Sequence, residues 1–314
     1  MENKTNQSEF TFSGDGLKRN ISESSILVVY VNPIEYHGEH LPLTTDLLIS
    51  RGIKNLFPKE LRENFIDWPP IHLGVGPTGG PGSCETSYLE LKRVLLKLSK
   101  TIIRLKVKRV LVMTFHGAPL HILAIEEFVK VLRKNKVKAI NPFILMLQKL
   151  TYFNPEEFNE IHKYVPMENE KERNKLIKNI KFDFHGGMIE AGLVQYFNPE
   201  LIQKPLNEVP SIPELNLNNW IKVLENFIRP ISYKLAEEIE LINFVLQWGA
   251  IKPFPGYTGH PCLANNGLSE YFLNKVVLPS YLEEINKEFY GGGTKIIPVM
   301  NYMKYITFEG RLFY

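Results

Sequence analysis

Five side chains that can bind a metal ion or transfer a proton stand within residues 35–46. Glu35 and His37 are two residues apart, so in an extended chain their side chains leave on the same face. Gly38 allows a sharp turn that brings His40 back toward that face, and Asp46 stands at the start of an expected helix. Two carboxylates and an imidazole form half of a ligand shell for a divalent metal. The alternative is a polar loop in which Asp46 belongs to the helix cap and the histidines are exposed.

Two later segments carry residues of the same chemical types. His116 follows a β-branched run, so it should emerge at the carboxyl edge of a sheet. Asp183 and His185 are two residues apart, and a Gly-Gly pair then precedes a short helix that should present Glu190. Alone, His116 fits a structural role, and the later segment fits a helix cap with a surface acid. If all three segments meet at one sheet edge, they form a coherent site.

The spacing of apolar residues predicts the elements that must position these side chains. Strands are expected over 26–31, 68–73, 109–115 and 139–147, and helices over 45–53, 86–105 and 121–132. Short turns between them indicate right-handed crossovers, and therefore an α/β fold. We predict a three-layer α/β/α sandwich with a mainly parallel sheet. A long helical stretch over roughly 218–245 and a final helix and strand are predicted for the rest of the chain.

The domain organisation follows from local composition. Residues 1–24 are polar and charged, which predicts a flexible N-terminal tail. Residues 25–314 are predicted to form a single domain, with a charged, mostly helical insertion at about 150–181 that can serve as a flap or lid. A glycine-rich loop over 74–82 lacks the Gly-Lys-Ser/Thr ending of a phosphate-binding loop, and we interpret it as an active-site loop.

Composition excludes several classes of protein. The 314 residues include 37 Lys and Arg against 34 Asp and Glu, and a net charge of +3 gives no indication of nucleic-acid binding. We find no secretory signal and no apolar run of the ~18 residues that a membrane span needs, so we expect a cytoplasmic protein without a membrane or nucleic-acid partner. Cys84 and Cys262 are the only cysteines, which excludes a disulfide scaffold and a zinc site built mainly of thiolates.

The segments that carry these residues resemble the creatininase family of metal-dependent amidohydrolases. Residues 35–42, Glu-Tyr-His-Gly-Glu-His-Leu-Pro, with Thr45-Asp46, look like the family's Glu-x-His-Gly-x-His-Leu-Pro segment followed by Thr-Asp. Residues 183–190 resemble its Asp-x-His-Ala-Gly-x-x-Glu segment, and residues 114–119 and 256–267 resemble its second and last motifs. The four motifs occur in the family's order and cover most of the chain.

The resemblance implies a creatininase-like fold and a centre of two divalent metal ions per chain, Zn, Mn or Fe. Glu35, Asp46 and His116 would hold one ion, while His37, Asp46 and Glu190 would hold the other. His185 would be the catalytic proton shuttle to the leaving nitrogen. His40 is assigned to the catalytic residues together with His185, and its role would be to orient a metal ligand.

The activity implied is hydrolysis of a C–N amide bond by a hydroxide bound to the two ions. The substrate would be a small cyclic amide, a formamide or a short peptide, and the resemblance also implies a homo-oligomer. Family members that process creatinine carry a Glu where this chain has Ala118, which argues against creatinine. Pro119 and Thr114-Phe115 also depart from the family pattern. The alternatives are an inactive family member that binds metal or another ligand, and a sugar- or nucleotide-binding protein without metal.

Overall fold

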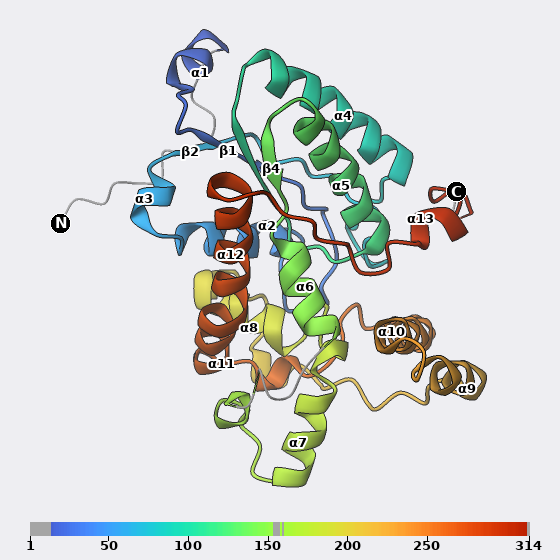
Figure 1. The fold of residues 1–314 in the computed structure, drawn as a ribbon. Helices are drawn as coiled ribbons and strands as arrows, with labels where there is room; N and C mark the ends of the chain where they lie inside the picture. Colours follow the sequence, from blue (N-terminus) through green and yellow to red (C-terminus); the bar gives the residue numbers. More distant parts are fainter. Residues whose placement is uncertain (1–13, 153–157, 159, 313–314) are drawn as a thin grey trace, which may run out of the picture.

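Four parallel strands form one sheet in the computed structural model, which describes residues 14–152, 158 and 160–312 (Figure 1). The strand order is β2–β1–β3–β4. The strands are β1 (Ile26–Tyr30), β2 (Phe65–Asp67), β3 (Arg109–Met113) and β4 (Lys138–Ile140). Because every pair is parallel, the carboxyl ends of all four strands meet at the same edge of the sheet.

Helices cover both faces of this sheet. The helices α4 (Tyr88–Arg104) and α5 (Pro119–Lys134) pack on one face, where they share a core with Leu27 and Val29 of β1. On the other face α2 (Thr45–Asn55) and α12 (Leu278–Tyr290) share a core with Val28. β1 is therefore buried on both faces, as a run of β-branched and apolar residues predicts. The predicted three-layer α/β/α sandwich with a parallel sheet is confirmed.

Further helices lie around these layers. They are α1 (Gly14–Asn20), α3 (Lys59–Arg62), α6 (Phe143–Thr151), α7 (Glu170–Lys178), α8 (Met188–Phe197), α9 (Asn219–Ile228), α10 (Tyr233–Gly249), α11 (Asn266–Phe272) and α13 (Met303–Ile306). Of the helices in the described part of the chain, none is both long and apolar enough to cross a membrane.

Two of the predicted strands are wrong in position or length. A strand was expected over 68–73, but the strand in this part of the chain is β2, which begins three residues earlier, at Phe65. Within 68–73 only Ile71 pairs with the sheet, through an isolated bridge to Val31. Pro69 and Pro70 lack the N–H groups that a ladder needs. The strand expected over 139–147 ends at Ile140, and α6 begins at Phe143 after the Asn-Pro pair. Short apolar runs do not distinguish a buried strand from a buried helix.

The C-terminal third agrees with the prediction only in part. The helical stretch expected over 218–245 is confirmed, but it is divided into two helices, α9 and α10, which are separated at Pro230 because proline disrupts a helix interior. The final strand is also wrong, since in residues 291–312 the structure places only α13 and turns.

The structure describes only part of the predicted N-terminal tail, residues 1–24, and of the predicted insertion, residues 150–181. Within the segment predicted as an N-terminal tail, residues 14–20 form α1, and residues 1–13 lie outside the described part. The insertion at 150–181 contains α7 and two short 3₁₀ turns, and its residues 153–157 and 159 also lie outside.

A buried acid on α5 makes stability depend on pH. Burial raises the pKa of Glu126 to about 7, although Arg133 and Lys130 oppose the shift. The folded protein therefore binds a proton more tightly than the unfolded chain, and stability falls as pH rises from about 4.5 to about 7. We expect Glu126→Gln to raise the free energy of unfolding by about 3 kcal/mol at pH 8 and by much less at pH 4.5. Urea unfolding at both pH values checks this, and an equal effect at both would contradict it.

Candidate metal centre

The candidate ligands converge on the carboxyl edge of the sheet. Glu35 and His37 follow β1, and His116 follows β3, the strand beside it. Asp46 lies in the first turn of α2, and Glu190 lies in the first turn of α8. All five side chains are buried, with at most 6% of their surface exposed.

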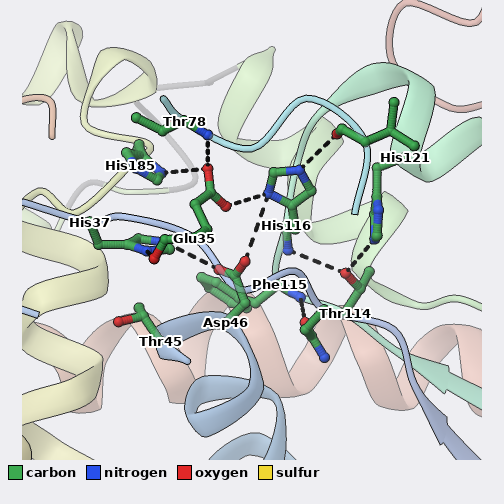
Figure 2. Close-up of polar contacts among 12 residues, drawn as sticks. Glu35, His37, Thr45, Asp46, Thr78, Thr114, Phe115, His116, His121 and His185 are labelled. Atoms are coloured by element: carbon green, nitrogen blue, oxygen red, sulfur yellow. Dashed lines mark hydrogen bonds and ion pairs between the residues drawn. The ribbon is translucent and has the colours of Figure 1, made fainter. Parts of the chain in front are cut away.

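One group of ligands contains Glu35, Asp46 and His116. Nδ1 of His116 lies 2.8 Å from Oε2 of Glu35 and 3.7 Å from Oδ2 of Asp46. Figure 2 shows the imidazole of His116 facing both carboxylates. The ligand atoms of this group all lie within 4.8 Å of one another, a spacing at which one metal ion can contact all three.

A second group contains His37, Asp46 and Glu190. Nε2 of His37 lies 3.4 Å from Oδ1 of Asp46 and 3.5 Å from Oε2 of Glu190. These ligand atoms also lie within 4.8 Å of one another. Asp46 therefore presents a different carboxylate oxygen to each of the two groups.

His185 lies at the same cluster but on its outer side. Nδ1 of His185 is 3.7 Å from Oε1 of Glu35, and its ring lies against that of His37 with the centroids 4.2 Å apart. Together with Glu35 and His37, it forms a third group whose ligand atoms are within 4.8 Å. His185 can therefore reach either a metal ion or a substrate bound there.

Backbone carbonyls orient all three imidazoles. Nδ1 of His37 is 3.0 Å from the Glu35 carbonyl oxygen, and Nε2 of His116 is 3.1 Å from that of Val75. Nε2 of His185 is 2.9 Å from the Tyr36 carbonyl oxygen. A carbonyl oxygen can only accept, so each of these nitrogens donates its proton there. In the neutral imidazole the other nitrogen then presents its lone pair to the cluster, as metal-binding histidines do.

The cluster fits a pair of divalent ions. Glu35 Oε2, His37 Nε2 and Asp46 Oδ2 are buried and have no hydrogen-bond partner among the described residues. When the imidazoles are neutral, as metal ligation requires, the three carboxylates give the site a charge of −3, which is costly to bury unless cations offset it. Without metal ions, protons on His37 and His116 offset part of this charge. Two divalent cations would supply the missing partners, and the oxygen and nitrogen donor set is one that Zn, Mn and Fe accept.

The pKa shifts reflect the same crowding of charge. Burial opposes protonation of His37, but Asp46 and the other two carboxylates outweigh burial and raise the pKa of His37 to about 10. The balance is similar at His116, where Glu35 raises the pKa to about 9 against the effect of burial. Burial raises the pKa of Glu190 to about 8. Burial, with His37 nearby, lowers the pKa of His185 to about 3, so this imidazole is neutral.

His40 does not reach the cluster directly. Gly38 makes the expected turn, with a φ of 75°, but Nε2 of His40 lies 2.8 Å from the backbone carbonyl of Gly186. The N–H of Gly186 in turn donates to Oε2 of Glu190 at 2.6 Å. His40 thus contacts the carbonyl of the residue whose N–H bonds to Glu190, and burial lowers the pKa of His40 to about 4.

Asp183 lies outside the cluster and holds the backbone around it. Its carboxylate accepts hydrogen bonds from the N–H of Ile189 in α8 at 3.1 Å and from the N–H of His260 at 2.9 Å. The alternative interpretation of this segment, a helix cap with a surface acid, is wrong, because Asp183 and Glu190 are both buried. Thr258, two residues before His260, accepts from the N–H of His185 at 3.1 Å, so the last motif supports the loop that carries His185.

We expect Gly259→Ala to destabilise the fold by about 2–4 kcal/mol. Gly259 has a φ of +67°, and a Cβ built there would collide with the carboxylate of Asp183. Gly79→Ala is the matched control, because its Cβ would meet nothing within 4 Å. Urea unfolding of the two variants measures the difference, and equal stabilities would contradict this role for the Asp183 loop.

Three positioning contacts escaped the sequence analysis. Asn32 joins the ends of two strands, since its Oδ1 accepts from the N–H of Phe115 at 2.9 Å and its Nδ2 donates to the Met113 carbonyl at 3.3 Å. The N–H of Thr78 donates to Oε1 of Glu35 at 2.5 Å, so the glycine-rich loop reaches the cluster through a residue that its sequence did not single out (Figure 2). The ring of Trp248 packs 5.7 Å from that of His185. Only Asn32, at the end of a strand, had a usable sequence signal.

Comparison with known proteins identifies what the chain is similar to. A family model described as creatininase, creatinine amidohydrolase, matches residues 13–278. No curated protein sequence matches the chain significantly. Among solved structures, a mutant creatininase complexed with creatine is 16% identical and has a TM-score of 0.59, with 89% of this chain and 97% of that one covered.

Two further solved structures of similar proteins are described by their metal, manganese or zinc. A structure titled as the Mn creatininase is 15% identical with a TM-score of 0.59, and covers 89% of this chain and 97% of its own. A mutant creatininase of Zn–Zn type is 16% identical with a TM-score of 0.55, and covers 85% of this chain and 92% of its own. At these identities the structures establish the shared fold, and the family model spans well over half of the sequence. The chain belongs to the creatininase (creatinine amidohydrolase) family.

Proposed function

We propose that this protein is a metal-dependent amidohydrolase that cleaves a C–N amide bond of a small substrate. The observation that carries the proposal is the pair of buried ligand groups that share Asp46. The two carboxylate oxygens of Asp46 would each bind one ion, at the edge of the sheet where α/β folds bind ligands. Membership of a family of amidohydrolases supports the choice of reaction.

The proposed ligands are five side chains. Glu35, Asp46 and His116 would hold one ion, and His37, Asp46 and Glu190 the other. Related structures are titled as Mn and Zn–Zn creatininases, which supports divalent ions of this kind. When bound, two such ions lower the pKa of water toward neutrality and polarise a carbonyl group, which is the chemistry that amide hydrolysis requires.

His185 is the proposed proton carrier. Its Nε2 is committed to the Tyr36 carbonyl, so Nδ1 is the nitrogen that can take up a proton at the cluster and release it to a leaving nitrogen. The packed rings of His37 and Trp248 fix the plane of this imidazole. His40 is proposed to position Glu190 through the backbone of Gly186, whose carbonyl contacts His40 and whose N–H bonds to Glu190, rather than to exchange protons with substrate.

The substrate class proposed is a cyclic amide, a formamide or a short peptide. Creatine is the ligand named for a related structure, which supports a small amide-related compound. Ala118 caps the N-terminus of α5 beside His116 and offers no polar atom in its side chain, which argues against creatinine itself.

Turnover of simple amides tests the proposal. The protein, reconstituted with Zn or Mn, is assayed against formamides, cyclic amides including creatinine, and dipeptides, with release of the amine or acid as the readout. Hydrolysis that disappears on chelation and returns with metal is the expected result.

The second candidate function is that of an inactive family member that binds metal. It is favoured by Thr114, Phe115 and Pro119, which depart from the family's residues in the second motif. Full metal content with no turnover of any of these compounds would support it.

A further inference from the structure

Positive charge is concentrated in one part of the fold, the layer of α4 and α5 with the strands that follow them (Figure 1). Of the 37 Lys and Arg in the chain, 13 lie in residues 91–138, together with only two of the 34 acids, so this segment has a net charge of +11. The other 24 cations and 32 acids give the rest of the chain a net charge of −8. The overall charge of +3 thus averages two oppositely charged parts, and such an asymmetry points to an anionic partner.

Helix α4 presents a row of cations to solvent, the α4 stripe, which consists of Arg93, Lys97, Lys100 and Arg104. Their i, i+4, i+7, i+11 spacing places them on one face of the helix, opposite the apolar face that packs on the sheet. All four side chains are exposed, and none forms an ion pair with an acid in the described part of the chain. At 1.5 Å per residue, the stripe is about 16 Å long.

Two turns with the same Lys-Val-Lys sequence, residues 106–108 and 136–138, carry further cations. The first leads from α4 into β3, and the second leads from α5 into β4. Because β3 and β4 pair in parallel, the two turns lie side by side at the amino edge of the sheet. In both turns the valine is buried and the lysines are exposed.

Lysine occupies the left-handed position of each turn. Lys106 and Lys136 have φ values of 59° and 61°, a conformation that glycine adopts more readily than a residue with a side chain. The other lysine of each turn is engaged, since Lys108 lies 4.0 Å from Glu23 and Lys138 donates to a backbone carbonyl. Lys106 and Lys136 form no ion pair with any described residue. Together with the α4 stripe they make up six unpaired cations, which we call the basic surface.

We infer that the basic surface binds the phosphate backbone of a nucleic-acid duplex. Each strand of a duplex presents one phosphate per ~3.4 Å of its axis, so the α4 stripe can face about five phosphates of one strand. Cations without acidic partners lose no ion pair on binding, and each phosphate contact releases condensed counterions. The phenylalanines of this segment, Phe115 and Phe128, are buried and cannot stack on bases, which favours backbone contacts without sequence preference.

The segment lacks the apolar groups that a membrane-binding surface would insert. Within residues 91–138, Val94 is the one exposed large apolar residue, at 37%. Stable attachment to lipid takes a second, apolar signal in addition to a basic patch. Charge without apolar groups therefore favours a nucleic acid over a lipid bilayer.

Fluorescence anisotropy tests the inference, with a labelled DNA duplex of about 24 base pairs and mixed sequence titrated with the full-length protein. We expect a dissociation constant on the order of 1 µM at 50 mM NaCl. Five phosphate contacts should weaken binding about 100-fold when NaCl is raised to 150 mM. A duplex of unrelated sequence should bind equally well, because the contacts are to phosphates.

Reversal of charge on α4 should remove most of this binding. The double variant Lys97→Glu and Lys100→Glu is expected to raise the dissociation constant about 30-fold or more at 50 mM NaCl. The matched control is Lys171→Glu with Lys178→Glu, two exposed lysines of α7 outside the basic surface. The control changes the net charge by the same amount and should raise the dissociation constant less than about threefold.

A second variant separates binding from folding. Lys106→Gly with Lys136→Gly removes two cations and places glycine where the backbone favours it, so urea unfolding should show no loss of stability. Binding should weaken about 10-fold, and the slope of log affinity against log salt should fall by about 2. This variant decides the question if the α4 variant does not fold by circular dichroism.

Three outcomes would overturn the inference. The first is a wild-type protein that does not bind the duplex at 50 mM NaCl, and attachment to vesicles of phosphatidylglycerol and phosphatidylcholine in its place would assign the surface to membranes. The second is equal weakening by the α4 variant and the α7 control. The third is unchanged binding by the folded glycine variant. The basic surface contains no candidate metal ligand, so this inference and the proposed amide hydrolysis can fail separately.

Discussion

Replacement of His185 by alanine is expected to lower kcat by about 100- to 10,000-fold while both metal ions stay bound. The two proposed ligand groups, Glu35, Asp46 and His116, and His37, Asp46 and Glu190, do not include His185. What the variant loses is Nδ1, the atom whose lone pair faces the cluster because Nε2 is committed to the Tyr36 carbonyl. Steady-state kinetics on the best amide substrate and elemental analysis of the same sample measure the two quantities together.

Two further variants make the His185 result specific. His72→Ala removes an exposed imidazole and should leave kcat and metal content unchanged. His185→Gln restores polar atoms of similar size without a titratable nitrogen, so it should remain as slow as the alanine variant. A different result, in which His185→Ala loses one ion, would assign His185 to the third ligand group with Glu35 and His37 and contradict its role as a proton carrier.

Asp46→Ala is expected to remove both ions, and with them all hydrolysis. Asp46 is the one residue common to the two ligand groups, and it offers Oδ1 to one and Oδ2 to the other. Its removal leaves each position with two protein ligands, fewer than the three that catalytic zinc sites retain. Elemental analysis after gel filtration should show a fall from about two ions per chain to near zero.

Glu39→Ala is the matched control for this loss. Glu39 lies in the same segment, but its side chain is exposed and pairs with Lys204 at 2.6 Å. This variant should keep its full metal content. If Asp46→Ala also kept two ions, Asp46 would not bridge them, and if it kept one, the two positions would not share the residue.

Chain connectivity explains why much of the site was visible in the sequence. Parallel strands bring their carboxyl ends to one edge, so residues that follow β1 and β3 must lie close together once both strands are recognised. The i, i+2 spacing of Glu35 and His37 and the helix start at Asp46 then place these ligands locally. The position of Glu190 needed the family resemblance, because α8 reaches the cluster from a segment about 140 residues later.

The features that were missed depend on tertiary contacts. The apolar run over residues 143–147 fits a buried strand as well as a buried helix, and the structure forms α6 there, packed against α12. The contact between Thr78 and Glu35 uses a backbone N–H, which carries no residue-type signal. The orientation of His40 toward Gly186 was also hidden, because spacing shows that a chain can turn but not which side chain faces the ligands.

The metal content of the native protein is the most direct test of the central claim. Protein purified without chelator, and then exposed to Zn or Mn and desalted, should contain about two ions per chain by elemental analysis. This result is expected because three buried carboxylates and two imidazoles otherwise face one another without hydrogen-bond partners at Glu35 Oε2, His37 Nε2 and Asp46 Oδ2. A chain that holds no stoichiometric metal under both conditions would contradict the account and leave only the fold.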